Sequence, residues 1–164
     1  MSRTVHLEWF DHAGPRAGRR DAKAEDAGLR FSCTQCGGCC TGESGYVNFT
    51  DDEAAAMARH VGVTIDEFLR TYTRDTPMGR SLTERKTAFG YDCVFLDRET
   101  IPGKAVCGLY EHRPMQCRTW PFWKSNLSSE HAWRRAAEGC PGVDRGPSLT
   151  APAEVRRQRG LVEM

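Results

Sequence analysis

The stretch Cys33-Thr-Gln-Cys36-Gly-Gly-Cys39-Cys40 decides how the rest of this sequence can fold. It contains four of the eight cysteines in the chain, and the two glycines let the backbone curl so that several sulfurs face a common centre. The repeated spacing of Cys33, Cys36 and Cys39 supplies three soft ligands from one short loop. We interpret this stretch as a metal-binding loop that needs further ligands from elsewhere in the chain.

Four cysteines in the second half of the sequence are the candidates for those further ligands. They are Cys93, Cys107, Cys117 and Cys140. A four-coordinate centre that takes three thiolates from the loop needs a fourth from another segment. We therefore expect the fold to bring the late cysteines to the loop, which makes all eight cysteines candidate metal ligands in one region.

The adjacent pair Cys39 and Cys40 bears on the number of metal centres. In extended backbone, successive side chains point to opposite sides, so these two cysteines would be poorly placed to bind the same ion. One hypothesis is two neighbouring centres, with the first three loop cysteines and one late cysteine at one, and Cys40 with the remaining late cysteines at the other. The alternative is a single centre, with the spare thiols buried as structural side chains.

The composition predicts one small domain with a modest core. A chain of 164 residues has the length of one domain and can remove about 70% of its extended surface from water. The hydrophobic share is 39% and the mean hydropathy is −0.59, so metal cross-links would supplement the core. We predict a flexible N-terminal arm over residues 1–30, a cysteine-cluster metal-binding domain over 31–142 and a C-terminal tail over 143–164.

Helix signals surround the cysteines. Residues 50–53 read as a capping box, and the helix that follows is expected to end at Gly62. Residues 64–67 repeat the pattern and start a second helix. Further short helices are expected over residues 130–138 and after Pro152.

Strand signals alternate with these helices. Residues 45–49 form a short strand candidate, and residues 86–96 with 105–110 predict a β-hairpin that carries Cys93 on one arm and Cys107 on the other. Opposite residues on paired strands lie about 5 Å apart, so the hairpin would deliver two ligands side by side. The predicted fold class is therefore α+β, a small metal-stabilised single domain with short helices and a β-hairpin.

The segment around Cys117 adds two arginines to the candidate site. Pro114 suits the first turn of a short helix that holds Cys117, and Pro121 is expected to end it. Arg113 and Arg118 flank this cysteine, and their N–H groups could neutralise thiolate charge around a bound cofactor. The alternative for both arginines is a salt bridge to a carboxylate nearby.

The balanced charge and the lack of long apolar segments indicate which partners and which cellular location to expect. The sequence has 23 Lys and Arg against 22 Asp and Glu, so neither nucleic acid nor a membrane surface is the expected partner, whereas a protein partner stays open. The beginning of the sequence has no apolar signal segment, and no stretch approaches the roughly 18 apolar residues of a membrane span. We expect a cytoplasmic protein with reduced thiols, the alternative being a four-disulfide exported domain.

No motif in the sequence assigns an enzyme class. The phosphate-binding, dinucleotide-binding, zinc-protease and serine-hydrolase patterns are all missing. Glu43 and Asp92 lie beside cysteines along the chain and could move protons, but we interpret both as surface carboxylates. His60, in the last turn of its predicted helix, is interpreted as a surface histidine.

The ordered set of cysteines and their neighbours resembles a known family. It comprises the cysteine loop, Cys93-Val-Phe-Leu, Cys107-x2-Tyr110-x2-Arg113-Pro114-x2-Cys117-Arg118-x2-Pro121-Phe122 and Cys140-Pro141-Gly142. This set resembles the CxxCxxCC cysteine-cluster proteins, the YkgJ-like family of zinc- or iron-chelating domains. The resemblance covers residues 31–142 and implies a zinc- or iron-sulfur-binding domain without an agreed reaction. Some flagellin lysine methylases carry a similar cysteine cluster.

We expect the cofactor to be an iron-sulfur cluster or zinc. Both accept four thiolates, so the ligand type does not separate them. The Cys-x2-Cys-x2-Cys run and the late Cys140-Pro141 step are typical of cluster-binding loops, whereas zinc sites usually have two paired knuckles. We predict an iron-sulfur protein active in electron transfer or redox sensing; a structural zinc module for protein interaction is the alternative.

Metal rather than disulfides is predicted to stabilise this domain. A strong chelator should therefore lower the melting temperature, because it removes a ligand that binds only the folded chain. A thiol reductant alone should leave the melting temperature unchanged. Thermal unfolding followed by circular dichroism checks both expectations, and a chain that is destabilised by the reductant but not by the chelator contradicts them.

Overall fold

The computed structural model describes residues 7–12 and 27–162, which fold into short helices and short antiparallel strand pairs. This mixture confirms the predicted α+β class. The described residues divide into two compact units. The first unit comprises the described residues of 1–34 and 121–164, and the second comprises residues 35–120. The predicted domain boundaries, and the stabilisation of the fold by metal, stay predictions.

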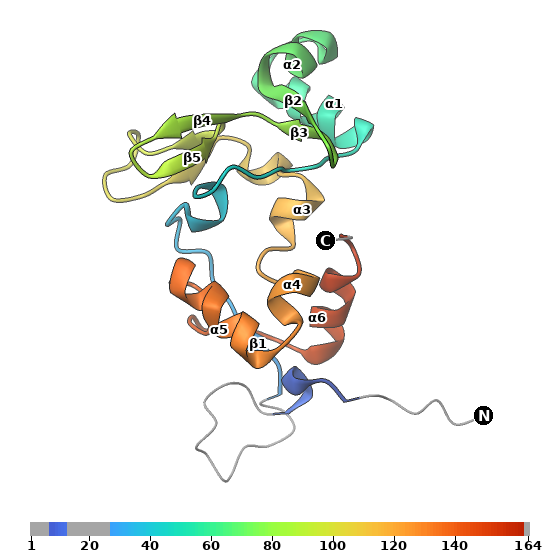
Figure 1. Ribbon diagram of the computed structural model, residues 1–164, viewed down its shortest axis with the longest axis vertical. Helices are drawn as coiled ribbons and strands as arrows, with labels where there is room; N and C mark the ends of the chain where they lie inside the picture. Colours follow the sequence, from blue (N-terminus) through green and yellow to red (C-terminus); the bar gives the residue numbers. More distant parts are fainter. Residues whose placement is uncertain (1–6, 13–26, 163–164) are drawn as a thin grey trace, which may run out of the picture. The chain divides into compact units, whose positions relative to one another are not determined.

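Two capped helices form one part of the second unit. Helix α1 (Asp51–Val61) begins with the predicted capping box, in which the Thr50 hydroxyl accepts from the Glu53 amide and the Glu53 carboxylate accepts from the Thr50 amide. Gly62 ends α1 in the left-handed conformation, as predicted. Helix α2 (Ile65–Tyr72) is capped by Thr64 and packs beside α1 (Figure 1).

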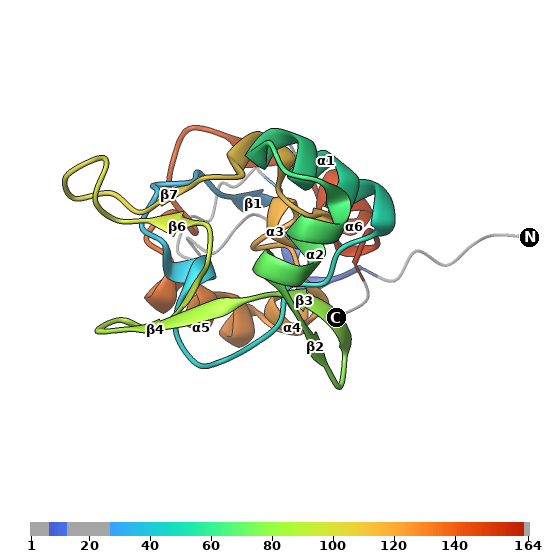
Figure 2. The same cartoon turned by 90° about the horizontal axis from the view of Figure 1, so that it is seen from above.

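Three consecutive hairpins follow the helices in the second unit. They pair β2 (Thr73–Thr76) with β3 (Gly79–Leu82), β4 (Glu84–Thr87) with β5 (Gly90–Cys93), and β6 (Leu96–Asp97) with β7 (Val106–Cys107). Every pair is antiparallel. The long turn between β6 and β7 extends away from its strands in Figure 2.

The predicted hairpin with Cys93 opposite Cys107 is wrong in its pairing. Cys93 ends β5 and lies opposite Glu84, whereas Cys107 ends β7 and lies opposite Leu96. The chain turns between Cys93 and Leu96, so the predicted long arm divides between two hairpins. The two cysteines nevertheless come together, because both pack against one apolar cluster.

That apolar cluster is the core of the second unit. Its buried members are Met57, Ala58, Phe68, Leu82 and Leu109. Cys93, Phe95 and Cys107 lie against it, half-buried. The ring of Phe95 stacks on that of Phe68 with 6.1 Å between the ring centroids. The core thus reaches from the helical pair to the last two hairpins, where two candidate ligands lie.

The strand predicted over residues 45–49 is reduced to a single bridge. Asn48 pairs with Ser81 in an isolated antiparallel bridge, and the Leu82 amide donates to the Val47 carbonyl at 3.1 Å. The Val47 amide donates to the Ser81 hydroxyl instead of to a strand carbonyl, at 2.8 Å. Side-chain acceptors therefore replace the ladder that a full strand would have.

After β7 the chain runs through the 3-10 helix η4 (Tyr110–His112) into helix α3 (Met115–Arg118). Pro114 stands at the cap of α3, as predicted. The Met115 amide donates to the Glu53 carboxylate at 2.6 Å, so the capping residue of α1 also accepts the first free N–H group of α3. Helix α3, which carries Cys117, is in this way attached to α1.

The first unit is built around buried aromatic rings. It contains the 3-10 helix η1 (Trp9–Asp11), the pair β1 (Leu29–Arg30) with β8 (Leu149–Thr150), and helices α4 (Lys124–Leu127), α5 (Glu130–Gly139) and α6 (Pro152–Arg159). The helices predicted over residues 130–138 and after Pro152 are present as α5 and α6. Trp133 of α5 is fully buried and stacks on Phe122 at 5.8 Å.

Part of the predicted arm takes part in this first unit. Phe10 and Leu29 are fully buried, and the indole of Trp9 donates to the Leu127 carbonyl at 2.9 Å. Arg159 of α6 binds the Glu8 carboxylate at 2.8 Å. The rest of the arm over residues 1–30, including its basic run, lies outside the described residues.

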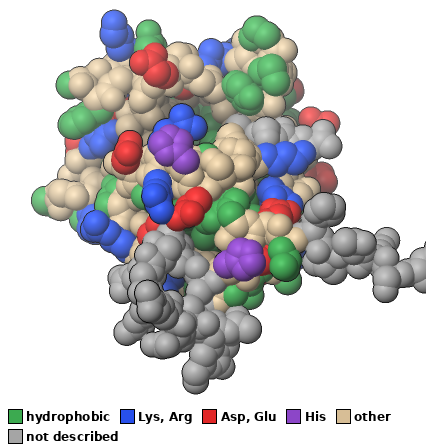
Figure 3. Space-filling model, turned by 60° about the horizontal axis from the view of Figure 1, so that its bottom comes forward, with side chains coloured by type: hydrophobic (Ala, Val, Ile, Leu, Met, Phe, Trp, Pro, Cys, Tyr) green, Lys and Arg blue, Asp and Glu red, His purple; other side chains and the backbone are tan. Residues whose placement is uncertain are grey.

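The surface carries both signs of charge. Basic and acidic side chains lie next to each other on the face drawn in Figure 3, as the balanced composition predicts. In the described part of the chain, no helix combines the length and the apolar character that a membrane crossing requires.

The capping of α1 yields a stability prediction. Replacing Thr50 with Ala removes the acceptor for the Glu53 amide and should lower the free energy of unfolding by about 1 kcal/mol. Thr50→Ser keeps the hydroxyl and should cost less than half as much. Urea unfolding at equal metal content measures both; equal losses in the two variants would show that the hydroxyl does not stabilise the helix.

Candidate metal centre

The cysteine loop is a tight turn rather than an extended segment. Gly37 adopts a left-handed conformation with φ of 76°, and the 3-10 helix η3 (Gly38–Cys40) follows it directly. The Cys40 amide donates to the Gly37 carbonyl at 2.9 Å, and the Gly38 amide donates to the Cys36 sulfur at 3.4 Å. Backbone N–H groups aimed at sulfur stabilise thiolates, which are the form that binds metal.

The expectation that Cys39 and Cys40 point apart is wrong. It assumed extended backbone, but both residues lie in η3, and their sulfurs are 3.5 Å apart with a hydrogen bond between them. Two thiolates on one tetrahedral zinc, each about 2.3 Å from the metal, lie about 3.8 Å from each other. The pair is therefore spaced for one shared centre, and the reason given for two separate centres no longer holds.

Three late cysteines of the second unit lie close enough to this pair for their charges to interact. They are Cys93 at the end of β5, Cys107 at the end of β7 and Cys117 in α3. The charges of Cys93 and Cys117 act on Cys40, and those of Cys39 and Cys107 act on both Cys93 and Cys117. Five thiols from four segments thus form one electrostatic group, which we call the thiol cluster.

Burial and mutual repulsion oppose ionisation in most of the thiol cluster. Burial raises the pKa of Cys93 to about 11, and burial also raises the pKa of Cys117 above its usual range. The hydrogen bond from Cys40 lowers the pKa of Cys39 to about 7, while donating that bond and being buried raise the pKa of Cys40. Of these four thiols, Cys39 is accordingly the one most readily ionised.

Arg113 supplies a positive charge to the thiol cluster. Its charge lowers the pKa of both Cys39 and Cys117. The guanidinium is held in place by a hydrogen bond from its Nε to the Tyr110 carbonyl at 2.8 Å, and it lies 3.8 Å from the centre of the Tyr110 ring. The arginine thus lies where the sequence interpretation placed it, beside candidate ligands; its role toward a bound cofactor stays a prediction.

Arg118 has a different partner. Its guanidinium forms an ion pair with the Glu53 carboxylate at 3.5 Å. This contact matches the alternative that was considered for both arginines, a salt bridge to a carboxylate. The carboxylate is the one that caps α1, so Arg118 supports the attachment of α3 to α1.

A buried ion pair holds the end of the cysteine loop. Asp92 is fully buried, so its interpretation as a surface carboxylate is wrong. Arg98 donates two hydrogen bonds to this carboxylate, at 2.8 and 3.0 Å, and the Thr41 hydroxyl donates a third. The hydrogen bonds from Arg98 lower the pKa of Asp92, which keeps the carboxylate charged. No sequence motif marks this trio, because its members come from three separate segments.

Backbone contacts hold the loop on both sides. The Gln35 carbonyl accepts from the Ala105 amide at 2.8 Å, and the Gly42 carbonyl accepts from the Tyr91 amide at 2.8 Å. At Gly37 a side chain would also come within 2.7 Å of the Ala105 methyl group. The two ends of the loop are therefore bound to the segment before β7 and to β5, which carries Cys93.

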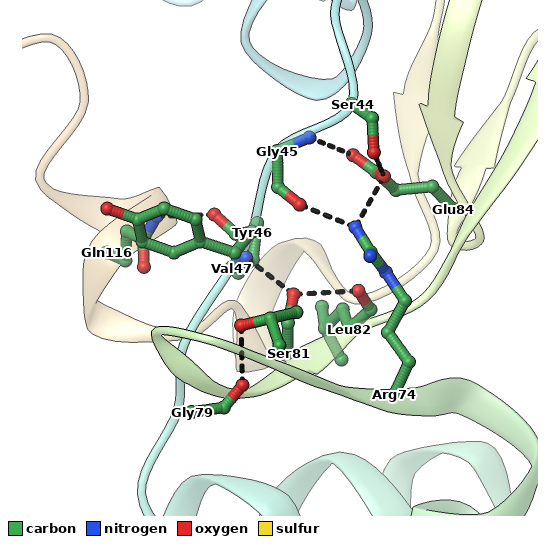
Figure 4. A network of polar contacts seen from close by, with 11 residues as sticks. Ser44, Gly45, Tyr46, Val47, Arg74, Gly79, Ser81, Leu82, Glu84 and Gln116 are labelled. Atoms are coloured by element: carbon green, nitrogen blue, oxygen red, sulfur yellow. Dashed lines mark hydrogen bonds and ion pairs between the residues drawn. The ribbon is translucent and has the colours of Figure 1, made fainter.

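A second polar network fixes the segment after the loop (Figure 4). Glu84 accepts from the Ser44 hydroxyl at 2.8 Å and from the Gly45 amide at 2.9 Å, and it forms an ion pair with Arg74 at 2.6 Å. Glu84 lies opposite Cys93 in the β4–β5 pair. This network connects the exit of the loop to the strand that faces a candidate ligand.

Gln116 connects α3 to the segment that follows the cysteine loop. Its amide nitrogen donates to the Tyr46 carbonyl at 2.9 Å (Figure 4). Its amide oxygen accepts from the Asn48 amide at 2.8 Å. The side chain is 4% exposed, and it satisfies backbone groups of a stretch that pairs with β3 through a single bridge only. Because Gln116 precedes Cys117, it fixes the position of that cysteine. The sequence interpretation missed both Glu84 and Gln116, because a sequence does not show which distant backbone groups a long polar side chain will bind.

Three cysteines remain outside the thiol cluster, and two of them belong to the first unit. Cys140 follows the end of α5 and is 4% exposed, and Cys33 is exposed near the bridge between Phe31 and Val143. Cys36 lies in the second unit, at the entry to the cysteine loop, and is exposed. The proposed ligand roles of these three cysteines stay predictions.

All eight cysteines lie within the described residues, and no disulfide joins any of them. Among those residues, no group of three or more His, Cys, Asp or Glu side chains has the arrangement that holds a single metal ion. The structure thus brings five thiols into one electrostatic group.

The family model CxxCxxCC, described as "Putative zinc- or iron-chelating domain", matches residues 32–141. This match covers well over half of the chain, so the chain belongs to that family. The match includes all eight cysteines and supports metal binding in general terms. No solved structure matches the chain.

Removing the buried charge that holds the loop should destabilise the protein. Asp92→Asn leaves the Arg98 guanidinium without its carboxylate partner and should cost about 3 kcal/mol of unfolding free energy. Asp75→Asn, at an exposed ion pair with Arg80, is the matched control and should cost less than about 1 kcal/mol. Chemical unfolding compares the two, and similar small losses would show that the buried pair does not organise the unit.

Proposed function

We propose that this chain binds an iron-sulfur cluster through the thiols of its second unit, and that it acts in electron transfer or redox sensing. The observation that supports this proposal most directly is the thiol cluster, in which sulfurs from the cysteine loop, β5, β7 and α3 act on one another electrostatically. When bound, an iron-sulfur cluster supplies reversible one-electron transfer. Membership of a zinc- or iron-chelating family agrees with metal binding in general.

The donor set fits such a cofactor chemically. Iron-sulfur clusters are held by cysteine thiolates, and the second unit offers six cysteines. In order they are Cys36, Cys39, Cys40, Cys93, Cys107 and Cys117. On sequence grounds we add Cys33 and Cys140 as candidate ligands. This is more than one tetrahedral zinc requires, which favours a larger cofactor or more than one centre.

The electrostatics of the thiol cluster favour a cation or cationic cofactor at its centre. Burial and neighbouring sulfurs raise the pKa of Cys93 and of Cys117, so these thiols ionise unfavourably by themselves. A bound metal reverses that balance, because it stabilises the thiolates directly. Arg113 adds a positive charge beside Cys39 and Cys117, where it would help to compensate the charge of an anionic all-thiolate cluster.

The proposal places the protein in the cytoplasm. Thiols stay reduced in that compartment and remain available as ligands. Cysteines gathered in one group without a disulfide are what a reducing environment would maintain.

A structural zinc module is the second candidate. The observation that favours it is that the thiol cluster joins four segments around a small apolar core, where a cross-linking ion would add stability. Such a module would present its surface to a protein partner and would have no redox chemistry. Zinc and iron-sulfur proteins differ in colour and in redox activity, so one preparation distinguishes them.

The deciding experiment is anaerobic purification with iron supplied, followed by metal and acid-labile sulfide analysis. We expect a brown protein that contains iron and sulfide and bleaches reversibly on reduction. Cys117→Ser should lower the iron content and weaken the chromophore, whereas Ser44→Ala, next to the loop but without a sulfur, should retain both. Stoichiometric zinc without iron or sulfide would end the electron-transfer proposal and leave the structural module.

Arg113 provides a test specific to electron transfer. Arg113→Ala should keep the iron content and shift the midpoint reduction potential to a more negative value, because a positive charge near the cluster stabilises its reduced form. Arg113→Lys should shift it less. An unchanged potential in Arg113→Ala would show that this arginine does not influence the cofactor.

A further inference from the structure

Two histidines of the second unit lie against each other outside the thiol cluster. His60 is in the last turn of α1 and His112 is the last residue of η4. Their ring centroids are 4.7 Å apart, with 44° between the ring planes. Both side chains are exposed, which agrees with the surface position expected for His60. The pairing with a histidine 52 residues away was not expected from the sequence.

The hydrogen bond of His60 determines which of its ring nitrogens keeps a lone pair that could bind a metal. Its Nε2 lies 2.9 Å from the Gly108 carbonyl oxygen, and a carbonyl only accepts, so Nε2 carries the proton and donates. The Nδ1 atom of the neutral ring then keeps a lone pair. Histidines that bind metals typically donate their other N–H group to a carbonyl or a carboxylate in this way, which fixes the ring orientation and strengthens the ligand.

The spacing of the two rings suits a shared ion. A ring nitrogen lies about 1.1 Å from the ring centre and about 2.1 Å from a bound zinc, so the metal lies about 3.2 Å from each centroid. With the centroids 4.7 Å apart, the angle between them at such an ion is about 95°. That angle lies between the values for octahedral and tetrahedral coordination.

We propose that His60 and His112 together bind a borderline divalent metal ion, of the class of Zn²⁺ and Ni²⁺, at a surface site separate from the thiol cluster. Imidazole is a preferred ligand for these ions. Two imidazoles leave the remaining coordination positions to water, so the site binds its ion exchangeably. The inference does not depend on which metal the cysteines bind.

The test is a Ni²⁺ titration of the full chain, purified anaerobically with its own metal in place. Equilibrium dialysis should show a Ni²⁺ ion bound in addition to the resident metal. His60→Ala and His112→Ala should each weaken that binding on the order of tenfold or more. His131→Ala, which removes an exposed histidine of the first unit, is the matched control and should leave the binding unchanged.

A second measurement needs no substitution and excludes misfolding as the cause. In imidazole ¹⁵N spectra of the unmodified chain, Ni²⁺ should broaden the His60 and His112 signals before that of His131. Metal analysis after dialysis should find the resident metal retained. The proposal is overturned if His131 responds equally, if both histidine variants bind Ni²⁺ as the unmodified chain does, or if Ni²⁺ binds only by displacing metal from the cysteines.

Discussion

The buried carboxylate of Asp92 is the constraint on which the candidate site depends. A buried charge is tolerated only where hydrogen bonds and an opposite charge replace water, and here Arg98 and the Thr41 hydroxyl provide them. Thr41 follows Cys40 in the chain and Asp92 precedes Cys93, so the requirement to satisfy one carboxylate brings two candidate ligands into register. Packing of apolar side chains alone would not specify that register, because it lacks direction.

The thiol cluster is held together against its own electrostatics. Burial and neighbouring sulfurs, Cys39 among them, raise the pKa of Cys93 and Cys117. The charge of Arg113 acts in the opposite direction on Cys117. Hydrogen bonds of polar side chains around the thiol cluster therefore hold its segments in place, because the sulfurs do not attract one another. Glu84 accepts from one backbone amide and one hydroxyl of the segment that leaves the loop, and Gln116 satisfies two backbone groups of the same segment. This segment lies between the loop and α1.

Local signals were predictable from the sequence, and long-range polar pairing was not. The Thr50 capping box, the Gly62 stop and the Pro114 helix start were all predicted correctly, because each depends on backbone chemistry within a few residues. The Cys39–Cys40 geometry was missed, since it depends on the left-handed Gly37 and the 3-10 turn after it. The division of the predicted hairpin and the burial of Asp92 were missed because they depend on partners from distant segments, which no periodicity encodes.

The scaffold also bears on what a bound metal would contribute to this protein. Where a site exists only in the presence of metal, binding and folding are one event, as in small zinc modules. Here the cysteine loop is attached at both ends by hydrogen bonds and an ion pair that involve no sulfur, so its position is specified by the polypeptide itself. A metal bound to such a prepared loop stabilises the fold by mass action rather than by creating it. A site of that kind could change the oxidation state of its metal while the unit stays folded, which redox function requires and a purely structural role does not.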